Sequence, residues 1–144
     1  SPFDSVFGGS WILEDNYNSV IVVNTNKAAA VVCLQEKNPP FRTVRNEYLE
    51  PGTSYRINGI PKGTYFLKAY FGREWDPKKL INGRKVKGGF KEELGFYKSD
   101  NKENLITIDH KNSGEHLYYS TYEVYLSTLY AKPDRAMKEV DFFK

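Results

Sequence analysis

Apolar and polar positions alternate along much of this chain with a period of two, which is the period of a β-strand. The clearest case lies within residues 51–72, PGTSYRINGIPKGTYFLKAYFG. Alternation over residues 53–58 predicts a half-buried strand, and the aromatic and β-branched residues of 64–71 predict a second one. Between them, Asn-Gly and Pro-Lys-Gly supply turn chemistry over residues 58–63. The stretch therefore predicts a hairpin-like unit around which the rest of the chain is organised.

Three further extended segments precede this unit. The β-branched run Val20–Asn24 is typical of a strand buried on both faces, and a polar turn joins it to the apolar run Ala29–Leu34. These two runs predict a first hairpin. Pro39-Pro40 cannot lie in a central strand because neither residue has a ladder donor, so a loop is expected there before an extended segment at 41–49.

The alternation stops after Gly72. Residues 73–87, REWDPKKLINGRKVK, are predicted to form a long basic loop that carries a tryptophan. Asp76-Pro77 has the form of a helix N-cap followed by proline at the first helical position, which predicts one helical turn. Asn82-Gly83 is a strong turn signal. Loops of this length in a compact domain are usually functional or disordered.

Alternation resumes in the last third of the chain. Residues 90–97 predict a strand with a bulge at Gly95, residues 105–108 a short strand, and residues 117–130 a strand running the height of a sandwich.

About seven to eight short strands with turn chemistry between them predict an all-β fold, an antiparallel β-sandwich or barrel. We expect one domain over residues 1–144 because no repeat or linker interrupts the pattern. Residues 1–18 are expected to form a loosely ordered lead with one short apolar segment. Residues 132–144 are expected to form a tail that docks through Val140, Phe142 and Phe143.

The segment IPKGTYFLKAYFG at 60–72 resembles the "(I/V)PPGTYTLKV" element of carboxypeptidase-regulatory-like and PEGA-type β-sandwich modules. Over most of the chain, the order AAAVVCL, RTVRNEYLEPGTSYRINGIPKGTYFLKAYFGREWDP, FYKSDNKENLITID, STYEVYLSTL and EVDFF is similar to an uncharacterised bacterial domain family. That family is common in Bacteroidetes and is often attached to an anchor or to other modules. The resemblance implies a Greek-key, transthyretin-like (prealbumin-like) sandwich and bacterial origin, and it supplies no catalytic residues to carry over.

Composition and charge bear mainly on which classes of partner and site are expected. Eleven tyrosines among 144 residues fit a β-rich protein, and a net charge of +3 with a pI near 8.8 favours no nucleic acid. No apolar run approaches the ~18 residues of a membrane helix. The single cysteine excludes an intramolecular disulfide. Since the chain begins without Met, we expect that a signal peptide, anchor or further domain was removed, with loss of the initiator Met as the alternative.

Three groups of residues are candidates for catalytic or metal sites. Cys33 lies in Val-Val-Cys-Leu, where a free thiol packs as a small hydrophobe. Glu92 and Glu93 are adjacent in a strand and point to opposite faces, so they cannot act jointly as acid and base. Asp109, His110, Glu115 and His116 bracket one turn, but their spacing matches no metal motif and favours solvated turn residues. No enzyme activity, metal or cofactor is therefore predicted.

The sequence predicts a non-catalytic interaction module. Its expected partner is a protein or an attached domain, and its expected compartment is the bacterial cell envelope rather than the cytoplasm. Strand addition at an exposed sheet edge is a second mode of recruitment. The alternative is a carbohydrate- or small-ligand-binding module that uses Trp75 and surface tyrosines, although a buried Trp75 and ordinary strand tyrosines are the plainer interpretation. The candidate binding residues lie in the basic segment: Arg73, Trp75, Lys78, Lys79, Arg84 and Lys85. The tyrosines of that alternative are Tyr118, Tyr119, Tyr122, Tyr125 and Tyr130.

Overall fold

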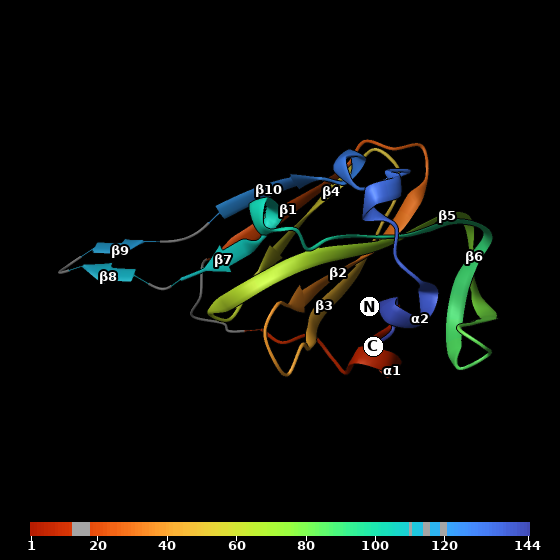
Figure 1. The fold of residues 1–144 in the computed structure, drawn as a ribbon, viewed down its shortest axis with the longest axis horizontal. Coiled ribbons are helices and arrows are strands. Elements are labelled where there is room, and N and C mark those ends of the chain that lie inside the picture. The colour runs from red at the N-terminus through yellow and green to blue at the C-terminus, as the bar shows by residue number, and fades with distance from the viewer. Residues whose placement is uncertain (13–17, 110, 114–115, 119–120) are drawn as a thin grey trace.

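The computed structural model describes residues 1–12, 18–109, 111–113, 116–118 and 121–144, and the side chains of 110–120 are outside it. The described part is mostly β, with eight strands in two sheets, and its two α-helices have four residues each (Figure 1). A separate two-stranded ribbon extends from one end. This confirms the expected β-rich two-sheet domain. The strands are β1 (Ser19–Asn24), β2 (Ala29–Glu36), β3 (Thr43–Leu49), β4 (Thr53–Asn58), β5 (Gly63–Ile81), β6 (Val86–Ser99), β7 (Ile106–Ile108), β8 (Lys111–Ser113), β9 (His116–Tyr118) and β10 (Thr121–Tyr125). The helical segments are α1 (Asp4–Phe7), η1 (Lys102–Asn104), η2 (Leu126–Thr128), η3 (Pro133–Arg135) and α2 (Glu139–Phe142).

The smaller sheet has the order β10-β1-β4, and its central strand is β1. Strand β4 runs antiparallel to β1, whereas β10 runs parallel to it, with Ser19 opposite Thr121. The parallel pair departs from the wholly antiparallel sandwich that the sequence predicts. Between β1 and β10 the chain passes to the larger sheet, returns for β4, and passes to the larger sheet again.

The predicted first hairpin is wrong, because β1 and β2 lie in different sheets. The buried Asn24 explains the crossing. Its Nδ2 donates to the carbonyl of Ala28 at 3.0 Å and approaches the carbonyls of Leu49 and Glu50, and its Oδ1 accepts the Asn26 N–H at 3.2 Å. These bonds satisfy backbone groups of an arch rather than a ladder, so the chain turns away from β1.

The larger sheet has the order β3-β2-β5-β6, is antiparallel throughout, and carries β7 beside the first residues of β5. The organising unit of residues 51–72 has its two strands as predicted, but they do not form a hairpin. Strand β4 pairs with β1 in the smaller sheet, and β5 pairs with β2 and β6 in the larger one. The turn at 59–62 therefore carries the chain from one sheet to the other.

The predicted loop over 73–87 is also wrong, as is its helical turn. Strand β5 continues to Ile81, and β6 begins at Val86, so most of this segment is a β-hairpin around the predicted Asn82-Gly83 turn. The pairing skips between Asp76 and Leu80, and this irregularity accommodates Pro77, which has no ladder donor. A second irregularity places Leu94 as an extra residue beside Gly95, which confirms the bulge predicted there.

The long strand predicted for 117–130 is divided in the structure. Strand β9 ends at Tyr118, β10 covers only Thr121–Tyr125, and the 3-10 turn η2 follows at once. Strands β8 and β9 form the ribbon that extends beyond the sandwich in Figure 1.

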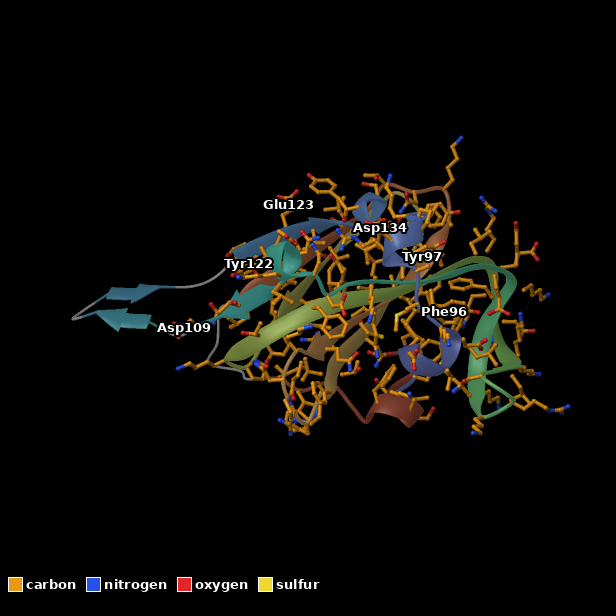
Figure 2. The ribbon with its side chains drawn as sticks, in the orientation of Figure 1. Phe96, Tyr97, Asp109, Tyr122, Glu123 and Asp134 are labelled. Carbon is orange, nitrogen blue, oxygen red and sulfur yellow. The ribbon has the colours of Figure 1, made fainter. Side chains whose placement is uncertain are left out.

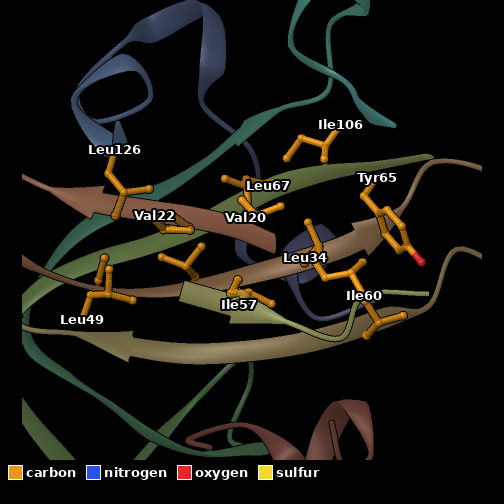
Figure 3. Close-up of a cluster of buried hydrophobic side chains, with 14 of the residues drawn as sticks. Val20, Val22, Leu34, Leu49, Ile57, Ile60, Tyr65, Leu67, Ile106 and Leu126 are labelled. Carbon is orange, nitrogen blue, oxygen red and sulfur yellow. The ribbon is translucent and has the colours of Figure 1, made fainter. Parts of the chain in front are cut away.

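The inner core lies between the two sheets and is mainly aliphatic (Figure 3). Val20 and Val22 of β1 and Ile57 of β4 face Leu34 of β2 and Leu67 of β5, all almost fully buried. Strand β1 is half-buried rather than buried on both faces, because Ile21 and Val23 retain partial exposure.

Side chains bridge both seams between the sheets. On one side, buried Arg45 of β3 donates to the Asn58 carbonyl of β4 at 2.7 Å. On the other side, the Tyr122 hydroxyl of β10 accepts the Thr107 N–H at 3.2 Å and donates to the Thr107 carbonyl at 2.7 Å (Figure 2). Tyr122 thus occupies edge groups of β7 that a neighbouring strand would otherwise take.

The outer core covers the opposite face of the larger sheet and is mainly aromatic. Phe3 beside α1 and Phe142 of α2 are both fully buried there, against Tyr70 of β5 and Phe96 of β6. Phe143 also packs into this cluster, whereas Val140 is exposed. Both chain ends therefore form the lid of this second core.

Candidate functional site: the tip of the β5–β6 hairpin

The far half of the β5–β6 hairpin curls over the outer core because glycines leave room for large side chains. A Cβ added at Gly72 would overlap the Phe90 ring across the ladder, and one added at Gly89 would lie 2.7 Å from Ile81 Cγ2. Without these Cβ atoms, Phe90 and Ile81 reach the outer core, where both are buried.

A hydrogen-bond network fixes the curl from beneath. The Tyr70 hydroxyl accepts the Phe90 N–H at 3.0 Å and donates to Glu93 Oε2 at 2.9 Å. Lys79 Nζ donates to Glu93 Oε1 at 3.0 Å and to the Phe90 carbonyl at 2.6 Å. Burial raises the pKa of the Tyr70 phenol far above its ordinary value of 10.0, so this hydroxyl stays protonated as a donor.

Trp75 belongs to the outer core rather than to a binding platform. Its ring lies 5.1 Å from Phe90, 5.8 Å from Phe3 and 5.9 Å from Tyr48, in edge contacts with all three. The structure thus places Trp75 as the packing residue that the plainer interpretation expected.

The turn itself is anchored to the C-terminal helix. Asn82, Gly83 and Arg84 all have positive φ, at 51°, 63° and 68°. The Asn82 N–H donates to Glu139 Oε1 of α2 at 2.6 Å. Positive φ is costly for a side chain as large as arginine and persists where the surroundings hold it. The turn is therefore held in one conformation, with Arg84 and Lys85 exposed at its end.

The structure divides the six predicted binding residues into two groups. Arg73 pairs with Glu92 at 2.9 Å, Lys79 is held in the network below the hairpin, and Trp75 is packed. The remaining three residues make no ion pair with any described residue and lie exposed near or at the turn: Lys78, Arg84 and Lys85.

Lys87 joins this second group. It lies opposite Leu80 in the hairpin register, and both side chains are exposed, Leu80 by 45%. Alternation could have indicated it, since Val86 points inward and Lys87 must then point outward. We call the unpaired cations Lys78, Arg84, Lys85 and Lys87, together with exposed Leu80, the basic tip.

The basic tip has an unbalanced charge. Residues 77–87 contain five basic and no acidic side chains, and only Lys79 of the five is paired among the described residues. Unpaired exposed cations on a rigid turn attract negatively charged groups, and they are most effective at low ionic strength.

The other candidate chemistries lead elsewhere. Cys33 is fully buried, and burial raises the pKa of its thiol to about 12, which confirms core packing rather than a thiolate nucleophile. Asp109 pairs with Lys62 at 3.7 Å, while His110, Glu115 and the side chain of His116 lie outside the described residues. Within the described part of the chain, no three His, Cys, Asp or Glu side chains are grouped as metal ligands would be.

The three candidate tyrosines whose side chains are described, Tyr122, Tyr125 and Tyr130, do not form one platform. Tyr122 bridges to β7, Tyr125 donates to Glu123 at 2.6 Å, and Tyr130 packs against Phe71 at 4.8 Å. The side chains of Tyr118 and Tyr119 are outside the described residues.

Among the described residues, no helix has the length and apolar character needed to span a membrane. Searches against protein families, curated proteins and solved structures find no match for this chain.

Proposed function

We propose that this chain is a non-catalytic interaction module and that the basic tip is its docking surface for an acidic partner protein. The observation that carries the proposal is the group of four unpaired cations around an exposed leucine, held on a turn that α2 and the outer core keep rigid. Rigid presentation reduces the entropy lost on binding. Charge complementarity at such a surface mainly raises the association rate and selects the partner.

The curl of the hairpin supports this role. Tyr70, Glu93 and Lys79 form a network whose effect is to fix the backbone beneath the basic tip. The positive charge of Lys79 is paired within this network and stabilises the backbone of the hairpin. The neighbouring cations of the basic tip face outward. A hairpin without such support would lose conformational entropy when it became ordered on binding, and this loss would weaken its affinity for the partner.

A fluorescently labelled polyglutamate peptide tests the proposal. Binding to the whole chain is measured by fluorescence anisotropy at about 50 mM salt, where surface charges are weakly screened. The variant Lys78→Gln/Arg84→Gln/Lys85→Gln should bind about tenfold more weakly, from roughly 0.5 kcal/mol for each exposed ion pair lost.

The matched control is Lys27→Gln/Lys102→Gln/Lys132→Gln, which removes the same net charge from exposed positions elsewhere. It should retain nearly wild-type affinity. Equal losses in the two triple variants would show that the peptide senses overall charge and would contradict a docking surface at the tip.

We also propose the finer fold assignment, a Greek-key sandwich of transthyretin-like type. Its support is the order of the strands, with β3-β2-β5-β6 facing β10-β1-β4, and the many crossings between the two sheets. Membership of a bacterial envelope protein is part of the same proposal and rests on the sequence resemblance. Surface labelling of cells that express the full gene product with a membrane-impermeant reagent tests the compartment.

A further inference from the structure

A cavity of about 190 Å³ opens in the seam where β10 passes the ends of β6 and β7. Two of the elements that line it, β7 and β10, lie toward the opposite end of the sandwich from the tip of the β5–β6 hairpin (Figure 1). The floor of the cavity is aliphatic and is formed by Leu67, Ile106 and Val124, of which the first two are almost fully buried members of the inner core. The cavity therefore reaches from the surface to the inner core.

The rim of the cavity offers oxygen atoms that accept hydrogen bonds. Tyr125 donates its hydroxyl to Glu123 Oε1 at 2.6 Å, which leaves Oε2 of the same carboxylate open. Thr128 donates to the Tyr125 carbonyl at 2.7 Å and keeps its oxygen lone pairs. Asn104 donates to Asn101 Oδ1 at 2.9 Å, so its own Oδ1 remains an acceptor. A ligand with hydrogen-bond donors can satisfy these oxygens.

Charge and size restrict the ligand further. None of the described residues that line the cavity is Lys, Arg or His, so an anion has no counter-charge there, and Glu123 would repel it. The volume lies below the roughly 300 Å³ at which pockets for drug-sized ligands begin. The ligand is thus small, not anionic, and rich in hydroxyl or ammonium donors.

The apolar floor of the cavity favours one of these two kinds of donor group, hydroxyl or ammonium. An ammonium ion gains little from three aliphatic side chains, whereas a sugar ring has a C–H face that packs on them while its hydroxyls reach the rim. Tyr125, which is 45% exposed, places an aromatic ring at the mouth, and Ser99 adds a hydroxyl at the wall. The hydrogen bond to Glu123 also raises the pKa of the Tyr125 phenol above its ordinary value.

From this arrangement we propose that the β10–β7 seam holds a binding site for one neutral pyranose ring. The site is independent of the basic tip and uses Glu123, Asn104 and Ser99 as hydrogen-bond partners. It differs from the expected carbohydrate platform, because Trp75 takes no part in it.

Titration of the ¹⁵N-labelled whole chain with neutral monosaccharides, followed by amide chemical shifts, tests the site. Glucose, galactose, mannose and N-acetylglucosamine are the probes. At least one should give saturable, millimolar binding with shifts centred on residues 99, 104–106 and 123–128. Glu123→Ala should weaken that binding about tenfold, as expected when a hydrogen bond to a charged group is lost.

Glu50→Ala is the control, because it removes an exposed carboxylate outside the cavity, and it should leave the affinity unchanged. Ser99→Ala should cost a few-fold in affinity, from roughly 1 kcal/mol for a neutral hydrogen bond. Each of three results would overturn the proposal: no saturable shift at the seam with any sugar, equal binding of methylammonium chloride there, or equal losses in Glu123→Ala and Glu50→Ala.

Discussion

The two cores on either side of the larger sheet differ in the kind of side chain that fills them. The inner core is aliphatic and joins strands of both sheets, whereas the outer core is aromatic and is closed by the two chain ends. The outer core also buries a lysine. Lys68 is fully buried, donates to the Phe142 carbonyl at 2.5 Å and lies 4.7 Å from the Phe7 ring and 5.0 Å from the Phe142 ring.

The difference shows how one sheet can serve two purposes. Its inner face follows the usual logic of a two-layer sandwich, with branched aliphatic side chains in register. Its outer face would be exposed without α1 and α2. Aromatic rings are large enough for two short terminal segments to cover that face, and the same rings support the hairpin that presents the basic tip.

The largest contrast should come from one truncation in each core. Leu67→Ala in the inner core should lower the free energy of unfolding by about 2–5 kcal/mol and reduce protection in both sheets. Phe142→Ala should act mainly on α1, α2 and the hairpin tip, since a terminal lid can open while the sandwich stays folded. Native-state hydrogen exchange separates the two patterns, and identical loss of protection across both sheets would show that the cores are one cooperative unit.

A smaller effect should follow from filling the space beneath Phe90. Gly72→Ala places a Cβ against that ring and should cost about 1–3 kcal/mol by overpacking, measured by urea denaturation. Gly9→Ala is the control, because no atom lies within 4 Å of the added Cβ, and it should be close to neutral. If Gly72→Ala were also neutral, the curl of the hairpin would not depend on this close contact.

The smallest effect concerns pH. Burial lowers the pKa of Lys68 from 10.5 to about 8, so the unfolded chain holds the extra proton between those values. Stability should therefore rise with pH above about 8, with a slope of at most about 1.4 kcal/mol per pH unit. Cys33 opposes this above pH 9.0, where the unfolded thiol ionises and the buried one, with a pKa of about 12, does not.

The useful window is therefore pH 8–9, before the unfolded thiol and the tyrosines ionise. Urea denaturation across this window should show the rise in wild type and in Lys27→Met, whose side chain is exposed, but not in Lys68→Met. Persistence of the rise in Lys68→Met would assign it to another group.

Strand positions could be predicted where alternation is regular, as in Thr53–Asn58 and Thr43–Leu49. Strand partners could not, because a period of two is the same whichever strand lies alongside, and Asn24 redirects the chain through hydrogen bonds that no pattern reveals. The hairpin over 73–87 was obscured because Pro77 and the left-handed Glu74 break the alternation within a continuous strand pair.

The basic tip could be foreseen in part from its density of lysine and arginine. The sequence could not show that Arg73 and Lys79 are neutralised, since their partners Glu92 and Glu93 lie on the returning strand. The seam cavity had no signal at all, because its walls come from β5, β6, β7 and β10 and meet only after folding.

The parallel pairing of β1 with β10 also affects how the chain folds during its synthesis. Ser19 pairs with Thr121, about a hundred residues later, so one edge of the central strand of the smaller sheet stays open until residue 121 has been synthesised. Non-local pairing of this kind slows folding, and an open apolar edge invites other chains. We expect the emerging chain to need protection on the ribosome, and truncations that remove β10 to aggregate even though β1, β4 and the whole larger sheet remain encoded.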